Sequence, residues 1–119
     1  MKRILVADDE ESLRYLITET LELGDYEILQ ARDGEEAFRL AIESKPDLIL
    51  LDMMMPKMTG FEVTQALRER GETTTIVLLT ARSQKESREK GLELGANYYL
   101  IKPFSPLELL NLVDTILGE

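Results

Sequence analysis

The chain has 119 residues and a net charge of −9, from 14 basic and 23 acidic side chains, so we expect one domain, residues 1–119, with a buried core. It has no histidine and no cysteine, which excludes Ser-His catalysis, histidine- or thiolate-bound zinc, disulfides and a phosphohistidine of its own. No apolar run reaches the roughly 18 residues of a membrane span, and no signal-peptide pattern is present. We therefore expect a cytoplasmic protein with no membrane partner and, given its acidity, no direct nucleic-acid binding.

Short apolar runs alternate with amphipathic segments along the whole chain. The pattern predicts strand 3–7, helix 11–23, strand 27–31, helix 34–44, strand 47–51, helix 60–70, strand 75–80, helix 84–94, strand 97–101 and helix 106–117. Continuous apolar runs bounded by polar residues are typical of strands that are buried on both faces. Five strand–helix units favour a doubly wound α/β fold with a parallel sheet and right-handed crossovers.

Capping signals support several helix boundaries. Asp33, Thr59 and Ser105 are each followed three positions later by glutamate, the spacing of a helix N-cap with its reciprocal partner. Gly24 and Gly95 stand where helix C-termini often need a left-handed residue.

Two helices differ in the strength of their apolar face. In the first helix the predicted core face consists of Leu13, Leu16, Ile17 and Leu21. The helix at 84–94 has only Leu92 and Leu94 as large apolar residues, so we expect a weakly anchored, movable element.

Three aspartates follow two of the apolar runs. Asp8 and Asp9 come after residues 4–7, and Asp52 comes after residues 48–51. If these strands are parallel neighbours, the three carboxylates lie at one edge of the sheet, where doubly wound folds bind ligands. Carboxylates about 5 Å apart repel by roughly 3 kcal/mol at an effective dielectric near 20. A Mg²⁺ ion would relieve that repulsion and suits carboxylate, water and phosphate oxygens.

Two further polar residues end later strands at the same edge. Thr80 follows residues 76–79, and Lys102 follows residues 98–101. A carboxylate can be a nucleophile toward phosphorus, and its phosphoryl product carries about −1.5 to −2 charges. The aspartates could hold a metal while Thr80 donates a hydrogen bond to the product and Lys102 pairs with it.

Four segments, in order and at the spacing of one family, carry a resemblance: ILVADDEE, PDLILLDMMMPKMTGFE, IVLLTA and LGANYYLIKPFSPLELL. Over its whole length the chain resembles the receiver domain of bacterial two-component response regulators, the chemotaxis-regulator-like family. The resemblance implies a flavodoxin-like fold with strand order 2-1-3-4-5 and five flanking helices. It also implies a phosphorylation-dependent signalling switch and not a metabolic enzyme, one that promotes only its own phosphorylation and slow dephosphorylation.

The resemblance assigns roles at the acidic cluster. Asp52 would be the phosphoacceptor, and Asp9 and Asp52 would bind Mg²⁺ directly together with the main-chain carbonyl of Met54. Asp8 would act mainly through a metal-bound water. The phosphoryl donor would be a histidine kinase or a histidine phosphotransfer protein.

The resemblance also implies a conformational switch. Thr80 and Lys102 match the family's hydroxyl and lysine, Tyr99 matches its rotating aromatic residue, and the Lys102–Pro103 bond would be cis. On phosphorylation Thr80 would move toward the phosphoryl group, and Tyr99 would turn inward. The face made by the fourth helix, fifth strand and fifth helix would then change its contacts with a downstream protein.

Two positions beside the phosphoacceptor distinguish this chain. Met54 and Arg82 occupy the sites, two residues after Asp52 and Thr80, that flank the path of an attacking water in the family. Neither side chain can orient a water as an acid or amide could, and arginine stays protonated. We therefore expect slow self-dephosphorylation.

Competing functions remain open to test. A flavodoxin-like cofactor binder needs a phosphate-cradling loop, but residues 8–11 are all acidic. An aspartate-based phosphatase usually has a second acid two residues after its nucleophile, where this chain has Met54. The main alternative is a receiver-like protein-interaction module that takes no phosphate, although such a module would have lost an acid, the threonine or the lysine.

The type of regulator is also open. The chain could be a stand-alone receiver or a domain excised from a longer transcription regulator. Receivers of transcription factors often carry basic residues along the last helix, where this chain has Asn111, Leu112 and Asp114. This difference favours a stand-alone receiver modestly.

Overall fold

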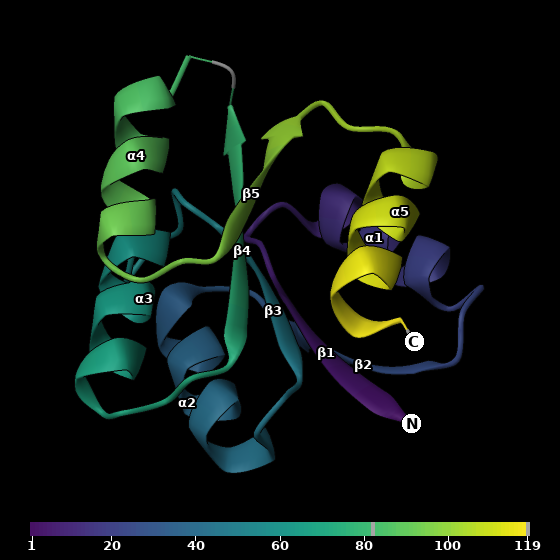
Figure 1. Cartoon of the computed structure of the whole chain (residues 1–119), viewed down its shortest axis with the longest axis horizontal. Helices are drawn as coiled ribbons and strands as arrows, with labels where there is room; N and C mark the ends of the chain where they lie inside the picture. The colour runs from purple at the N-terminus through teal and green to yellow at the C-terminus, as the bar shows by residue number, and fades with distance from the viewer. Residues whose placement is uncertain (82, 119) are drawn as a thin grey trace.

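A computed structural model describes residues 1–81 and 83–118. Over these residues the chain alternates strictly between strand and helix (Figure 1). The elements are β1 (Lys2–Ala7), α1 (Glu11–Leu21), β2 (Tyr26–Ala31), α2 (Gly34–Ser44), β3 (Leu48–Asp52), α3 (Gly60–Glu69), β4 (Thr75–Ala81), α4 (Lys85–Glu93), β5 (Tyr98–Lys102) and α5 (Pro106–Leu117). Every predicted element is present, and the predicted bounds differ from the observed ones by at most two residues.

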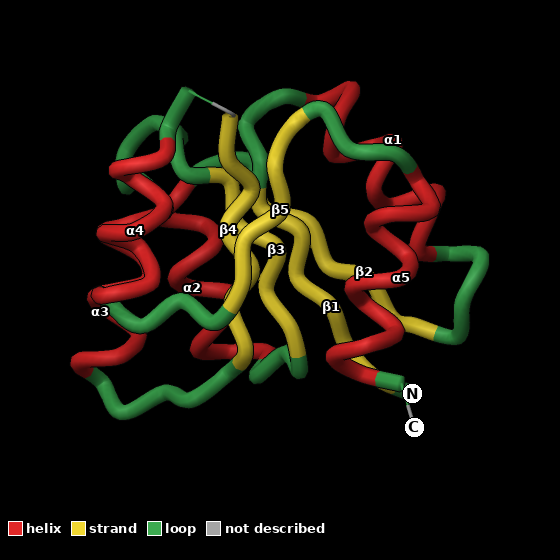
Figure 2. The backbone as a smooth tube through the Cα atoms, turned by 45° about the horizontal axis from the view of Figure 1, so that its top comes forward, coloured by secondary structure: helices red, strands yellow, loops and turns green. Residues whose placement is uncertain are grey.

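The strands form one parallel sheet in the order β2-β1-β3-β4-β5, as predicted (Figure 2). The register between β1 and β3 places Ala7 opposite Leu51. The residues that follow, Asp8 and Asp52, therefore leave two neighbouring strands at the same level. This register brings the acidic cluster together.

Helices cover both faces of the sheet, with α1 and α5 on one side and α2, α3 and α4 on the other (Figures 1 and 2). Successive strand residues point to opposite faces. In β1, Leu5 and Ala7 belong to the core under α2 and α3, whereas Ile4 and Val6 belong to the core under α1 and α5. Both faces are apolar because both are buried, which explains the continuous runs in the sequence.

The predicted N-caps are present. Thr59 and Ser105 each form a capping box with the glutamate three residues later. Asp33 accepts a hydrogen bond from the N–H of Glu36, but the carboxylate of Glu36 accepts from the N–H of Arg32 instead of Asp33. The N-terminus of α2 therefore has the N-cap hydrogen bond but lacks the reciprocal one.

One of the two glycine predictions is wrong. Gly95 has a φ of 116° after α4, as expected for a left-handed helix end. Gly24 does not have a positive φ; instead it gives room to the ring of Tyr26, which a Cβ at position 24 would approach to 2.7 Å. Left-handed residues follow α2 at Lys45 and α3 at Gly71, and neither position was predicted.

The predicted apolar face of α1 needs one correction. Ile17 and Leu21 are fully buried, but Leu16 is 46% exposed. Arg14 and Thr18 are buried on this helix instead, because each makes hydrogen bonds that compensate for the loss of water.

The weak anchoring predicted for α4 is observed. Gly91 is its only buried residue among those described. A Cβ at Gly91 would lie 2.3 Å from the side chain of Leu78, so glycine lets this helix approach β4 closely. Over the described part of the chain, no helix has the length and apolarity needed to cross a membrane.

Candidate functional site

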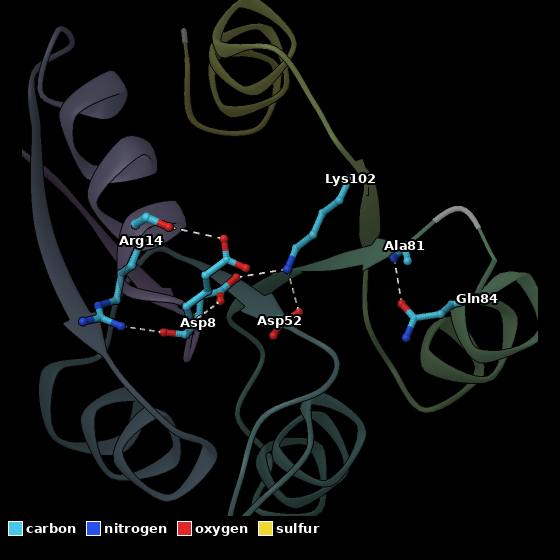
Figure 3. Close-up of polar contacts among 8 residues, drawn as sticks. Asp8, Arg14, Asp52, Ala81, Gln84 and Lys102 are labelled. Atoms are coloured by element: carbon cyan, nitrogen blue, oxygen red, sulfur yellow. Dashed lines mark hydrogen bonds and ion pairs between the residues drawn. The ribbon is translucent and has the colours of Figure 1, made fainter.

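The predicted acidic cluster is present at the carboxyl edge of the sheet (Figure 3). Asp52 is the last residue of β3, and Asp8 and Asp9 follow β1. One carboxylate oxygen from each lies within 4.8 Å of the others. Asp8 and Asp52 are buried, whereas Asp9 is exposed. The cluster thus offers oxygen ligands on a surface that remains open on the Asp9 side.

Lys102 joins this cluster, as predicted from its place at the end of β5. Its Nζ donates to Oδ2 of Asp8 at 3.2 Å and to Oδ1 of Asp52 at 3.0 Å. Figure 3 shows the lysine side chain extending across to both acids. The Lys102–Pro103 peptide bond is cis, as the resemblance implied. One ammonium therefore bridges two buried carboxylates.

Burial and neighbouring charges shift the pKa of both partners of this ion pair, Asp52 and Lys102. Burial and then repulsion from Asp8 raise the pKa of Asp52 to about 6, although Lys102 opposes the shift; Asp9 adds slightly to it. Burial alone would lower the pKa of Lys102, but Asp52 and Asp8 outweigh that effect, so its pKa lies above the usual value. At neutral pH Asp52 is ionised, but its negative charge is costly.

Binding of a cation that neutralises these carboxylates would therefore be favourable. The three carboxylates supply the hard oxygen ligands that Mg²⁺ prefers, and the exposed side leaves room for waters and phosphate oxygens. The donor set fits this ion. It lacks the nitrogen and sulfur ligands typical of zinc, since the chain has no histidine or cysteine.

Thr80 lies on β4, and its hydroxyl is buried without a hydrogen-bond partner among the described residues. An unpaired buried hydroxyl costs roughly 1 to 3 kcal/mol. A polar atom kept at this cost beside the acidic cluster is typical of a functional site. The unpaired hydroxyl supports the predicted role of Thr80 as a donor.

Tyr99 lies on β5, and its side chain is 44% exposed. The guanidinium of Arg88, on α4, lies over the tyrosine ring at 5.2 Å from its centroid. The predicted rotation of Tyr99 stays a prediction.

Of the two predicted lifetime positions, Met54 is described and Arg82 lies outside the described residues. The Met54 side chain is 59% exposed, next to the cluster in sequence. Its main-chain carbonyl as a metal ligand stays a prediction.

Four residues that support the site were not predicted. Arg14 binds the main-chain oxygen of Asp8, and Gln84 accepts a hydrogen bond from the N–H of Ala81 at 2.7 Å (Figure 3). Arg88 donates to the carbonyl of Ala81 at 3.0 Å. Gly60 was interpreted only as a helix start.

Gly60 in fact controls how closely α3 approaches the cluster. Its N–H donates to the carbonyl of Met53 at 2.9 Å. A Cβ on Gly60 would lie 2.6 Å from the carbonyl oxygen of Asp52 and 2.9 Å from the Cα of Met53. Any other residue would displace the end of β3, so glycine is required by space at this position.

The comparisons with known proteins agree with this geometry. The family described as "Response regulator receiver domain" matches residues 4–114. The chain belongs to this family. As a receiver domain of two-component response regulators, it works as a phosphorylation switch.

Curated relatives of this receiver domain are regulators of transcription. It is 47% identical over 116 residues to the alkaline phosphatase synthesis transcriptional regulatory protein PhoP of Bacillus subtilis (strain 168), covering 98% of this chain and 48% of PhoP. It is 41% identical to the phosphate regulon transcriptional regulatory protein PhoB of Pseudomonas aeruginosa, covering 98% of this chain and 52% of PhoB. The chain therefore spans about half the length of these curated relatives.

Solved receiver structures share the whole fold. The chemotaxis protein CheY4 of Vibrio cholerae superposes with a TM-score of 0.90 at 37% identity, over 98% of this chain and 99% of that one. The receiver domain of the Francisella response regulator 1452 gives 0.91 at 33% identity, over 98% and 96%. Relatives thus include both transcriptional and chemotaxis regulators, and the comparisons do not single out the chemotaxis-regulator-like group.

Proposed function

We propose that Asp52 is the phosphoacceptor of this receiver and takes the phosphoryl group from a phosphohistidine of a histidine kinase or phosphotransfer protein. The observation that carries the proposal is the bridge from Lys102 to Asp52 at 3.0 Å, inside a cluster of three carboxylates. This arrangement holds a nucleophilic oxygen next to a cation that can stay with the product.

The transfer step forms a bond between a carboxylate oxygen of Asp52 and phosphorus, and it breaks the phosphorus–nitrogen bond of the donor. The donor imidazole leaves with the electron pair and takes up a proton. The donor must be another protein, because this chain has no histidine. Asp52 must be ionised to attack, a condition met above its pKa of about 6.

Asp9 and Asp52 would hold Mg²⁺ directly, with Asp8 acting through a bound water and the Met54 carbonyl as a further ligand. When bound, the ion neutralises charge that develops on the transferred group. The carboxylates of this chain orient the ion, and the buried position of Asp52 limits access of water to the acceptor oxygen.

We propose that Lys102 and Thr80 then hold the product. The ammonium of Lys102 pairs with a phosphoryl oxygen, and the unpaired hydroxyl of Thr80 donates to another. Movement of Thr80 gives Tyr99 room to turn inward, which alters the face formed by α4, β5 and α5. A downstream protein reads that face.

The output of this receiver belongs to the same proposal. The names of its curated relatives describe control of transcription, which is consistent with a cytoplasmic protein and with a regulator in which other segments contact DNA. The receiver itself is acidic and would act by protein contact. The alternative of a module that takes no phosphate is not favoured, because the three acids, Thr80 and Lys102 are all present.

The test is labelling by acetyl phosphate in the presence of Mg²⁺, followed by intact-mass measurement. We expect one added phosphoryl group on the parent chain and none on Asp52→Asn. Asp25→Asn, which removes an exposed acid just before β2 at the opposite edge of the sheet, is the matched control and should be labelled like the parent. Labelling of Asp52→Asn at another residue would disprove the assignment.

A further inference from the structure

A buried arginine lies directly behind the acidic cluster. Arg14 on α1 is only 8% exposed. Its Nη1 donates to the main-chain oxygen of Asp8 at 2.7 Å, and its Nε donates to Oε1 of Gln30 on β2 at 3.1 Å. Figure 3 shows the guanidinium reaching the main chain of Asp8, away from the carboxylates. A buried cation that avoids three nearby carboxylates and binds a carbonyl instead calls for a functional explanation.

The carbonyl that Arg14 binds belongs to the peptide group joining Asp8 to Asp9. Because a peptide group is planar and includes the Cα atoms of both residues, holding its oxygen restrains the orientation of the unit that carries Asp8 and Asp9. Two further hydrogen bonds hold the same segment: the N–H of Asp8 donates to Ala31 at 3.2 Å, and Oδ1 of Asp8 accepts from Glu10 at 2.8 Å. Arg14 adds a hydrogen bond to the oxygen of the peptide group between the two acids.

We propose that Arg14 is a positioning residue for the metal site, which holds the Asp8–Asp9 peptide so that both carboxylates face Asp52. Unlike Lys102, Arg14 does this without occupying any carboxylate oxygen that a metal would use. Groups that orient metal ligands typically change metal affinity about 10- to 100-fold when removed. The inference rests on the proposed Mg²⁺-dependent phosphorylation of Asp52.

A positioning role for Arg14 and a purely electrostatic role predict different Mg²⁺ affinities for variants at this position. If Arg14 acts by geometry, both Arg14→Met and Arg14→Lys lose the guanidinium that bridges Asp8 and Gln30, and both weaken Mg²⁺ binding. If Arg14 mattered only as a charge, Arg14→Lys would match the parent. Arg14→Met would then bind Mg²⁺ more tightly, because a cation near the ion is removed.

The measurement is a Mg²⁺ titration followed by NMR at the amides of residues 8, 9 and 52, with thermal unfolding in chelator as the measure of stability. We expect the dissociation constant to rise about 10-fold or more in Arg14→Met and Arg14→Lys. Gln30→Ala, which removes only the second anchor of the guanidinium, should raise it by less. Its exposed position makes it a variant that keeps the fold.

Ile17→Val on the same helix is the control for a purely structural effect. It should lower the melting temperature while leaving the dissociation constant unchanged. Equal Mg²⁺ affinity in the parent, both Arg14 variants and Gln30→Ala would overturn the role of Arg14 and leave the proposed function standing. A parent chain that binds no Mg²⁺ would overturn the metal-dependent function itself, and the role of Arg14 with it.

Discussion

Arg88 on α4 lies over the ring of Tyr99 on β5, with its guanidinium carbon 5.2 Å from the ring centroid. The same guanidinium donates to the carbonyl of Ala81, the residue after Thr80, at 3.0 Å. One side chain therefore contacts both the end of β4 and the exposed aromatic ring. Tyr99 and the main chain next to Thr80 are therefore linked in this conformation through a helix that is otherwise weakly anchored.

Arg88→Met should loosen Tyr99. A cation–π contact at an exposed site contributes about 0.5 to 1 kcal/mol, so its loss should change the ratio of outward to inward ring positions about twofold to fivefold. NMR of ring-labelled tyrosine in the unphosphorylated protein measures this ratio. Lys90→Met is the matched control, because Lys90 is on the same helix as Arg88 and its Nζ lies 5.7 Å from the ring centroid of Phe61. An unchanged Tyr99 signal in Arg88→Met would show that the contact does not hold the ring.

Asp52→Asn should stabilise the protein at neutral pH without Mg²⁺. The pKa of Asp52 is raised to about 6 in the folded state, so the folded state binds more protons than the unfolded state between about pH 4 and 6. Stability from this group is present below about pH 4 and is lost as pH rises to 6. The asparagine side chain does not ionise, so the variant does not lose this stability as pH rises. We expect a gain of about 1 to 3 kcal/mol in unfolding free energy at pH 7.

Urea unfolding of the parent and of Asp52→Asn, at intervals from pH 4 to pH 7, measures this difference. The two curves should converge toward pH 4 and separate above pH 6. Parallel curves, with a constant difference at all pH values, would mean that Asp52 carries no raised pKa.

Thr80→Val should separate stability from switching. Valine keeps the shape of threonine and removes a buried hydroxyl that has no partner among the described residues, so unfolding free energy should stay the same or rise by about 1 kcal/mol. Labelling at Asp52 should continue, but the Tyr99 NMR signal should no longer respond to phosphorylation. A loss of more than about 2 kcal/mol would indicate that the hydroxyl is hydrogen-bonded in solution.

Mg²⁺ should raise the melting temperature of the parent chain. A ligand at ten times its dissociation constant stabilises the folded state by about 1.4 kcal/mol. Asp9→Ala should abolish the rise, although Asp9 is exposed and contributes little to the metal-free fold. Thermal melts with and without millimolar Mg²⁺ are suitable, since there is no tryptophan to report binding. A rise that persists in Asp9→Ala would place the ion elsewhere.

The aspartyl phosphate should be long-lived in this chain. Its hydrolysis needs a water in line with the phosphorus–oxygen bond, and the exposed Met54 side chain can neither orient nor activate one. Arg82 is predicted to flank the same path. We expect Met54→Asn combined with Arg82→Glu to decay faster than the parent, followed by intact mass over time. Decay of the parent within seconds, or no acceleration in the double variant, would refute this explanation.

The sequence was sufficient to predict the sheet and the acidic cluster for one physical reason. Parallel strands buried on both faces leave continuous apolar runs, and polar residues that end such runs meet at one edge. Asp8, Asp52, Thr80 and Lys102 could therefore be placed at one edge by counting along the chain, and residue type indicated metal and phosphoryl chemistry. The strand order and the choice of Asp52 as the phosphoacceptor came from the family resemblance.

Residues that act through tertiary contacts could not be found in this way. Arg14 stands between Leu13 and Tyr15 on a helix, and its burial depends on the main-chain oxygen of Asp8, which follows β1. Leu16 fits an apolar helical pattern but falls outside the contact with the sheet. Gly24 resembles a helix terminator, whereas its role is to leave space for Tyr26. Each depends on which surfaces meet, and spacing along one element does not contain that information.

The place of Lys102 in the chain has a consequence for synthesis. Its two acidic partners come 94 and 50 residues earlier, so the acids emerge from the ribosome long before the cation that bridges them. A nascent chain that ends before β5 has three crowded carboxylates and no counterion among them. Competence to receive a signal should therefore arise only once the fifth strand has joined the sheet, and incomplete chains should be silent toward a kinase.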